Sequence, residues 1–207
     1  MKLLNIIASP RGAKSRSIAV ASELLNSLKS KYPELKSKDL DLFKMNLPEV
    51  YGGSIDAKYA FIHGVMPAEE AMIAWNEITR YSQEFAEADI YVISTPMWNF
   101  SIPYKLKQYI DIIMQAGTLF RFTEHGVEGL AKNKKMFCVT TRGNDYSAGS
   151  AMQQFDFQEP YLRSIFGFAG ITDISFIHAQ PLDINPVIAA ASIEKAIADA
   201  KIIASAY

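Results

Sequence analysis

The feature that most constrains the fold is an alternation of short apolar runs with helical patterns, repeated about five times along the chain. Between the runs, apolar residues recur at helical spacing, as at Val20, Leu24 and Leu28. Strands that alternate with helices form a parallel sheet between two helical layers. The sequence therefore predicts an α/β sandwich over residues 1–207 as one domain. The strand-like runs are 3–8 (LLNIIA), 35–42, 88–95 (ADIYVIST), 135–141 (KMFCVTT) and 172–179 (TDISFIHA).

The segments between these runs are less regular in one place. Residues 43–66 contain Pro48, a Gly52–Gly53 pair and Gly64 and show no clean period, so we expect a long loop there. Its aromatic residues suggest that the loop either covers a site or forms a small surface core: Tyr51, Tyr59 and Phe61. A helix is expected to begin at Pro67, with an inward stripe of Ala71, Ala74, Ile78, Tyr81 and Phe85. Gly126 and Gly129 are interpreted as marks of a further connection.

Composition excludes several classes of protein. A net charge of −1 gives no reason to expect a nucleic-acid partner or an acidic membrane surface. The single cysteine, Cys138, excludes an internal disulfide framework, and its apolar neighbours indicate a core thiol. No apolar run approaches the roughly 20 residues of a membrane span. We therefore expect a cytoplasmic protein.

Three loops that follow predicted strands offer chemistry suited to a planar, anionic ligand. Residues 9–17 supply hydroxyls and cations before a helix, whose N-terminus can bind phosphate. Ser15 or Ser17 either caps that helix or turns its hydroxyl to a phosphate oxygen. Residues 96–103 hold Trp98, Asn99 and Phe100 between two prolines, and residues 141–145 place Arg142 beside Gly143. Ligands of open parallel sheets bind at such carboxyl ends of strands.

Several familiar motifs are absent from the sequence. There is no G-x-G-x-x-G after the first strand, and the GAKS of residues 12–15 lacks the GK[ST] of a P-loop. No G-x-S-x-G elbow occurs. The three histidines, His63, His125 and His178, lie far apart without ligand spacing, so no metal site is expected and His178 is interpreted as a satisfied core residue.

An ordered set of motifs resembles the FMN-dependent NADH azoreductases, relatives of the NAD(P)H:quinone oxidoreductases with a flavodoxin-like fold. The set comprises S-x-S at 15–17, PMWNF at 96–100, FRFTEHGVEGL at 120–130, TTRGN at 140–144 and PYLRSIFGFAGITD at 160–173. The similarity runs from the first predicted strand to the last.

The resemblance implies a five-stranded parallel sheet in the order 2-1-3-4-5 with helices on both faces. It also implies a homodimer with FMN at the interface, and two-electron ping-pong transfer from NADH or NADPH to quinones and azo compounds. Arg142 is then expected to offer a cation to the pyrimidine edge of the flavin, where reduction adds negative charge. Carried over by position, the FMN-binding residues would be Ser9, Ser15, Arg16, Ser17, Pro96, Met97, Trp98, Asn99, Phe100, Thr141, Arg142, Gly143 and Asn144.

Some positions depart from the family pattern or allow a second interpretation. The family commonly has Tyr at Trp98, Ser at Thr141 and Gly at Asn144, so Trp98 is expected to change substrate choice more than FMN binding. Phe120, Phe122 and Tyr51 are candidates for the substrate pocket, although Phe120 and Phe122 suit the core or a dimer interface better. The alternative function is a non-catalytic flavodoxin-like electron carrier, which the near-neutral charge disfavours. A phosphodiester hydrolase is disfavoured by the lack of metal ligands and a nucleophile.

Overall fold

The computed structural model describes residues 1–207, except for the side chains of Phe61, Ile62 and Ala74. The roles expected of Phe61 in a covering loop and of Ala74 in a helical stripe therefore lie outside the described residues. A parallel sheet of five strands occupies the centre of the molecule, in the order β2-β1-β3-β6-β7. The strands are β1 (Lys2–Ile7), β2 (Lys36–Asp41), β3 (Ile90–Pro96), β6 (Lys135–Thr141) and β7 (Asp173–Ala179).

The predicted parallel sheet of five strands is thus confirmed. The order agrees with 2-1-3-4-5 when only the strands of this sheet are counted, because β4 and β5 pair with each other outside it. β3 is buried along most of its length, which explains its continuous apolar run. β2 lies at one edge and exposes its lysines, so its sequence alternates only weakly.

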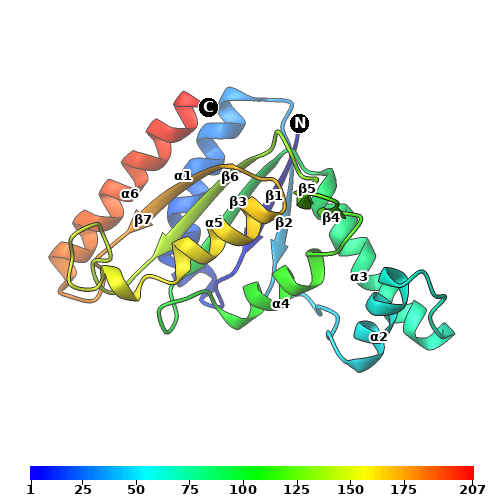
Figure 1. Ribbon diagram of the computed structural model, residues 1–207. Helices are drawn as coiled ribbons and strands as arrows, with labels where there is room; N and C mark the ends of the chain where they lie inside the picture. The colour runs from blue at the N-terminus through cyan, green and yellow to red at the C-terminus, as the bar shows by residue number, and fades with distance from the viewer.

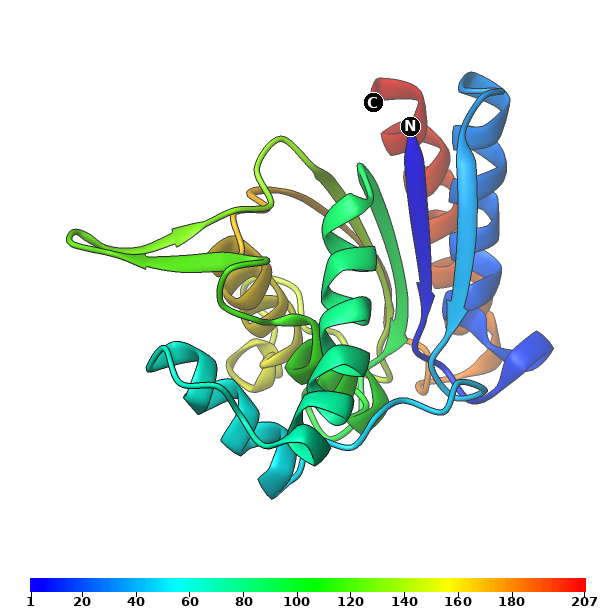
Figure 2. The same ribbon diagram turned by 90° about the vertical axis from the view of Figure 1, so that its right-hand side faces the viewer.

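Helices cover both faces of the sheet (Figures 1 and 2). α1 (Arg16–Lys31) and α6 (Pro186–Ala206) lie on one face, where Val20, Leu24 and Leu28 pack against the small alanines of α6. α3 (Glu69–Glu87), α4 (Tyr104–Ile113) and α5 (Gln158–Phe168) cover the other face and bury a second, more aromatic core. Cys138 is fully buried in β6, so the expected core thiol is confirmed, and burial raises the pKa of that thiol.

Two segments differ from the sequence prediction. The expected loop over residues 43–66 contains a helix, α2 (Gly52–Ile62), which packs beside α3 at the periphery of the molecule (Figure 1). Because α2 covers no face of the sheet and leaves Ile55 and Tyr59 exposed, it has no apolar stripe by which a helix is recognised.

The connection marked by Gly126 and Gly129 is an antiparallel hairpin of β4 (Phe120–Thr123) and β5 (Gly126–Gly129), which extends from the body as an arm (Figure 2). Its base touches the end of α5, where a Cβ on Gly129 would lie 2.2 Å from the backbone nitrogen of Gly170. Only glycine permits this close approach. In the described part of the chain, no helix is long and apolar enough to cross a membrane.

Candidate functional site

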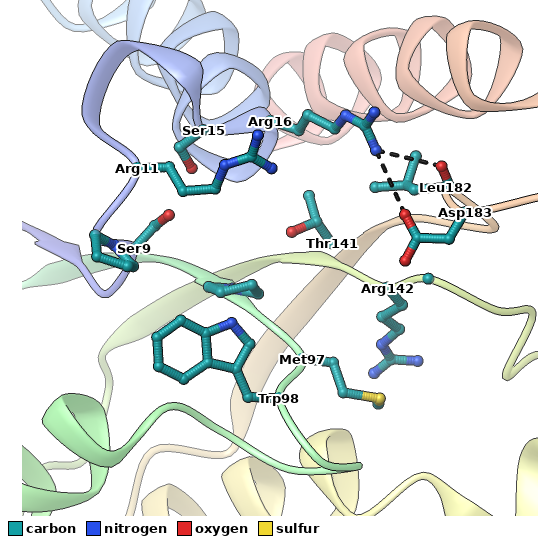
Figure 3. Close-up of a pocket in the computed structure, with 13 residues that line it drawn as sticks. Ser9, Arg11, Ser15, Arg16, Met97, Trp98, Thr141, Arg142, Leu182 and Asp183 are labelled. Carbon is teal, nitrogen blue, oxygen red and sulfur yellow. Dashed lines mark hydrogen bonds and ion pairs between the residues drawn. The ribbon is translucent and has the colours of Figure 1, made fainter. Parts of the chain in front are cut away.

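A cavity of about 150 Å³ opens at the carboxyl ends of β1, β3 and β6. Its position is that expected for a ligand site in an open parallel sheet. All three loops that the sequence analysis singled out contribute to it, and a fourth loop, which follows β7, completes the wall (Figure 3). The lining residues are Ser9, Pro10, Arg11, Ser15, Arg16, Pro96, Met97, Trp98, Thr141, Arg142, Gly143, Leu182 and Asp183.

One end of the cavity is formed by the start of α1. Ser15 is the N-cap residue of this helix, and its Oγ accepts a hydrogen bond of 3.4 Å from the N–H of Ile18. The buried hydroxyl of Ser17 lies 3.1 Å from that of Ser15 and does not line the cavity. Ser17 therefore contacts Ser15 on the side away from the cavity. The first turn of α1 contains no acidic residue. Its N–H groups and partial positive charge are therefore available to an anion.

Two arginines add positive charge to this end. Arg11 lies beside Ser15, and Arg16 points toward the loop that follows β7 (Figure 3). The Nη1 of Arg16 donates a 3.3 Å hydrogen bond to the carbonyl of Leu182 and lies 4.0 Å from the Asp183 carboxylate. Asp183 is mostly exposed, so this ion pair is weak.

The loop after β7 is held in place by the backbone of residue 143. The carbonyl of Gly143 accepts hydrogen bonds from the N–H groups of Leu182 and Asp183, at 2.9 and 3.0 Å. A Cβ at Gly143 would lie 2.3 Å from the Asp183 carboxylate. The absence of a side chain at Gly143 therefore allows the Asp183 side chain to pack against the backbone there. The sequence analysis missed Pro10, Leu182 and Asp183 and assigned no role to Arg11. Ligands bind beyond the carboxyl ends of parallel strands, and this rule holds for the last strand, β7, as well. Applied to β7, the rule would have predicted that residues 182 and 183 belong to the site.

The opposite end of the cavity is a tight turn over residues 98–101. Trp98 and Ser101 exchange two backbone hydrogen bonds, and the central residues Asn99 and Phe100 both have positive φ, of 46° and 69°. Positive φ at both central positions is the signature of a type I′ turn, in which a phenylalanine is strained. The indole of Trp98 is about one-third exposed and meets the ring of Phe43 edge-on at 6.0 Å between centroids.

The structure gives Arg142 a charge partner within the protein, and its expected role at the flavin edge stays a prediction. Its side chain is buried and points away from Ser15 and Arg16 (Figure 3). Its Nη1 lies 3.0 Å from the Asp156 carboxylate, and its Nε donates a 3.1 Å hydrogen bond to Gln158. Burial lowers the pKa of Arg142, and the nearby charge of Asp156 opposes that shift. The guanidinium is thus paired through Nη1 and Nε, while its buried Nη2 has no hydrogen-bond partner among the described residues, and the residue still contributes to the cavity lining.

The remaining predicted residues lie outside the cavity lining. Asn99 and Asn144 each follow a lining residue in the chain, and Phe100 lies two residues beyond Trp98, but none of the three lines the cavity. Phe120 is buried against Phe168 and Phe122, while Phe122 and Tyr51 are exposed.

His178 does not contribute to the cavity. Its Nδ1 lies 2.7 Å from the hydroxyl of Thr140 and its Nε2 lies 2.8 Å from Glu159. The hydrogen-bonded histidine expected from the sequence is confirmed, although its side chain is about one-quarter exposed rather than in the core.

Comparison with known proteins identifies the family. A family model described as flavodoxin-like fold matches residues 1–202. The chain is 41% identical over 202 residues to the FMN-dependent NADH:quinone oxidoreductase of Desulfotalea psychrophila, covering 97% of this chain and 93% of the relative. It is also 41% identical over 208 residues to the enzyme of the same name from Rhizobium meliloti, covering 98% of each chain. The chain belongs to the FMN-dependent NADH:quinone oxidoreductase family.

Solved structures agree with this assignment. An azoreductase from Bacillus anthracis superposes with a TM-score of 0.92 at 30% identity over 100% of both chains. An FMN-dependent NADH-azoreductase from the same organism, solved in complex with FMN, has a TM-score of 0.89 at 28% identity, covering 99% of this chain and 97% of its own.

Asn144, where the resemblance leads one to expect glycine, requires no unusual backbone conformation. Among described residues other than glycine, positive φ occurs at Asn99, Phe100 and Asn133, so Asn144 has ordinary backbone geometry. Asparagine at this position therefore introduces no backbone strain, and the tolerance of asparagine for positive φ is not needed there.

Proposed function

We propose that this protein is an FMN-dependent oxidoreductase that transfers electrons from NADH to quinones and aromatic azo compounds. The observation that carries the proposal is the cavity itself. It places serine hydroxyls and a helix N-terminus at one end and the Trp98 turn at the other. This arrangement suits a phosphate joined to a planar ring, and the names of the similar proteins specify FMN and NADH.

The donor set of the cavity fits FMN. Two buried hydroxyls, the first turn of α1 and two arginines match a phosphate dianion, which accepts several hydrogen bonds. A phosphate can replace the weak, exposed partner of Arg16. In this proposal the phosphate is held by Ser9, Ser15 and Arg16 with Ser17 behind them, and the ring lies against 96–100 and 141–144.

The protein then acts by positioning and electrostatics. Bound FMN supplies the two-electron chemistry between the pyridine nucleotide and the acceptor. The residues of the chain fix the cofactor, leave the partly exposed Trp98 at the open side, and keep the charge of Arg142 paired within the protein. This division of labour accounts for a cavity in which the described residues include no histidine or cysteine. NADPH as an alternative donor stays a prediction.

The visible spectrum of the purified protein tests the proposal. We expect flavin absorption in the blue, or its appearance after FMN is added, together with NADH-dependent reduction of a soluble quinone. An electron carrier would bind flavin but show no steady-state turnover with NADH as the donor. Colourless protein that neither binds added FMN nor reduces quinone would contradict the proposal.

We also propose that the protein is a homodimer with the cofactor sites at its interface. Exposed aromatic side chains support this assembly: Phe122 on the hairpin, Phe157 before α5 and Phe168 at its end. Sedimentation is expected to give twice the chain mass of 23.1 kDa, and a monomer at micromolar concentration would contradict the dimer. A cytoplasmic location stays a prediction from the sequence.

A further inference from the structure

Residues 155–158 contact both of the loops against which we place the flavin ring. We call this stretch, Phe155–Gln158, the brace segment; it runs from the end of the 3₁₀ turn η2 (Gln153–Phe155) to the first residue of α5. None of its residues lines the cavity at the strand ends. Each of them nevertheless holds a residue of the 96–100 or 141–144 loop through a specific contact.

Gln158 links the two loops directly. Its side chain is fully buried, with an exposed fraction of 0%. Its Nε2 donates a 2.9 Å hydrogen bond to the carbonyl of Pro96, and its Oε1 accepts the 3.1 Å hydrogen bond from Nε of Arg142. A buried amide that satisfies a backbone acceptor on one loop and a charged donor on the other couples the Arg142 side chain to Pro96, next to the backbone hydrogen bond of 2.8 Å from the N–H of Met97 to the carbonyl of Thr141.

Asp156 completes the anchor beneath the second loop. Its Oδ2 pairs with Arg142, while its Oδ1 accepts hydrogen bonds from the N–H groups of Gln158 and Glu159, at 3.0 and 3.1 Å. The same carboxylate therefore satisfies the start of α5 and orients Arg142. Through these two sets of contacts, Asp156 connects the 141–144 loop to the first turn of α5, which contains Gln158.

The other two residues of the brace segment hold the strained turn. The N–H of Phe157 donates a 3.0 Å hydrogen bond to the carbonyl of Phe100, and the ring of Phe155 stacks on that of Phe100 with centroids 5.3 Å apart. Phe100 is a bulky residue at positive φ, a conformation that persists only when its surroundings hold it. These two contacts provide such support.

We propose that the brace segment is a positioning element for the cofactor site, with Gln158 as the residue that couples Pro96 of one ring-binding loop to the Arg142 side chain of the other. This proposal rests on the proposed function in naming FMN as the ligand, but the contacts themselves do not depend on it. The brace segment acts through Pro96, Phe100 and Arg142 and touches no reacting group itself.

The test replaces Gln158 by methionine, which keeps the length of the side chain and removes both hydrogen bonds. In the protein without FMN, we expect amide hydrogen exchange at Met97, whose N–H donates a 2.8 Å hydrogen bond to the carbonyl of Thr141, to accelerate about tenfold, because the neighbouring Pro96 loses its anchor. In an FMN titration, we expect the dissociation constant to rise about tenfold and the spectrum of the bound flavin to shift. Gln115→Met is the matched control, because Gln115 is also buried but donates to the last turn of α4, at the carbonyls of Asp111 and Ile112.

The outcomes separate the two proposals. Unchanged exchange and unchanged FMN binding in folded Gln158→Met would overturn the positioning role, as would equal effects in Gln115→Met. If Gln158→Met does not fold, Phe155→Ala replaces it, because Phe155 is more than one-third exposed; we expect faster exchange at Ser101, and unchanged exchange would overturn the proposal. If the wild-type protein itself binds no FMN, the proposed function fails, while the exchange measurements still decide the role of the brace segment.

Discussion

Replacing Arg142 by methionine is expected to lower the free energy of unfolding by about 3–5 kcal/mol, the usual effect of removing one partner from a buried ion pair. The side chains of Arg142 and Asp156 are only 1% and 12% exposed, and the substitution leaves the carboxylate without its cation. The substitution also removes the hydrogen bond that Nε of Arg142 donates to Oε1 of Gln158. Urea-induced unfolding of the wild-type and variant proteins without FMN measures the effect.

The double variant Arg142→Met with Asp156→Asn is the matched control. An asparagine retains the oxygen that accepts from the N–H groups at the start of α5 but carries no charge. We therefore expect the double variant to recover part of the stability that the single variant loses. A single variant that unfolds at the same urea concentration as the wild-type protein would contradict the expected contribution of this ion pair to stability.

Replacing Ser15 and Ser17 together by alanine is expected to raise the dissociation constant of FMN by roughly tenfold to a hundredfold. One hydrogen bond to a charged group contributes about 1.5–3 kcal/mol, which corresponds to a change of this size. Ser15 faces the cavity and supports the first turn of α1, whereas Ser17 contacts Ser15 from behind. Ser15→Ala alone is therefore expected to produce most of the loss. Titration of the protein with FMN, followed by flavin fluorescence, measures it.

Asn185→Ala controls for the loss of a helix cap. Asn185 caps α6 through a 2.9 Å hydrogen bond from the N–H of Ile188 and does not line the cavity. Both cap substitutions are expected to lower stability by about 1 kcal/mol. Only the serine variants should weaken FMN binding, and equal affinities in all of these variants would refute the phosphate assignment.

Much of the fold follows from local sequence pattern. Five apolar runs of strand length with helices between them allow few topologies other than a parallel sheet covered on both faces. The edge strand β2 was harder to recognise because an edge needs no continuous apolar run. The helix α2 and the β4–β5 hairpin escaped prediction, since both lie outside the two main layers and lack their hydrophobic period.

The sequence by itself determined the parallel sheet and the three loops at its carboxyl ends, because strand and helix periodicity and the hydroxyls before α1 are local properties. Only the tertiary structure decided how those loops are used. Asp156 and Gln158 lie more than a dozen residues beyond Arg142 in the chain, yet Asp156 forms an ion pair with its guanidinium and Gln158 accepts a hydrogen bond from it. Leu182 and Asp183 likewise reach Arg16 from the far end of the chain. The electrostatics of a site depends on which groups are buried together, and that is settled by packing between distant segments.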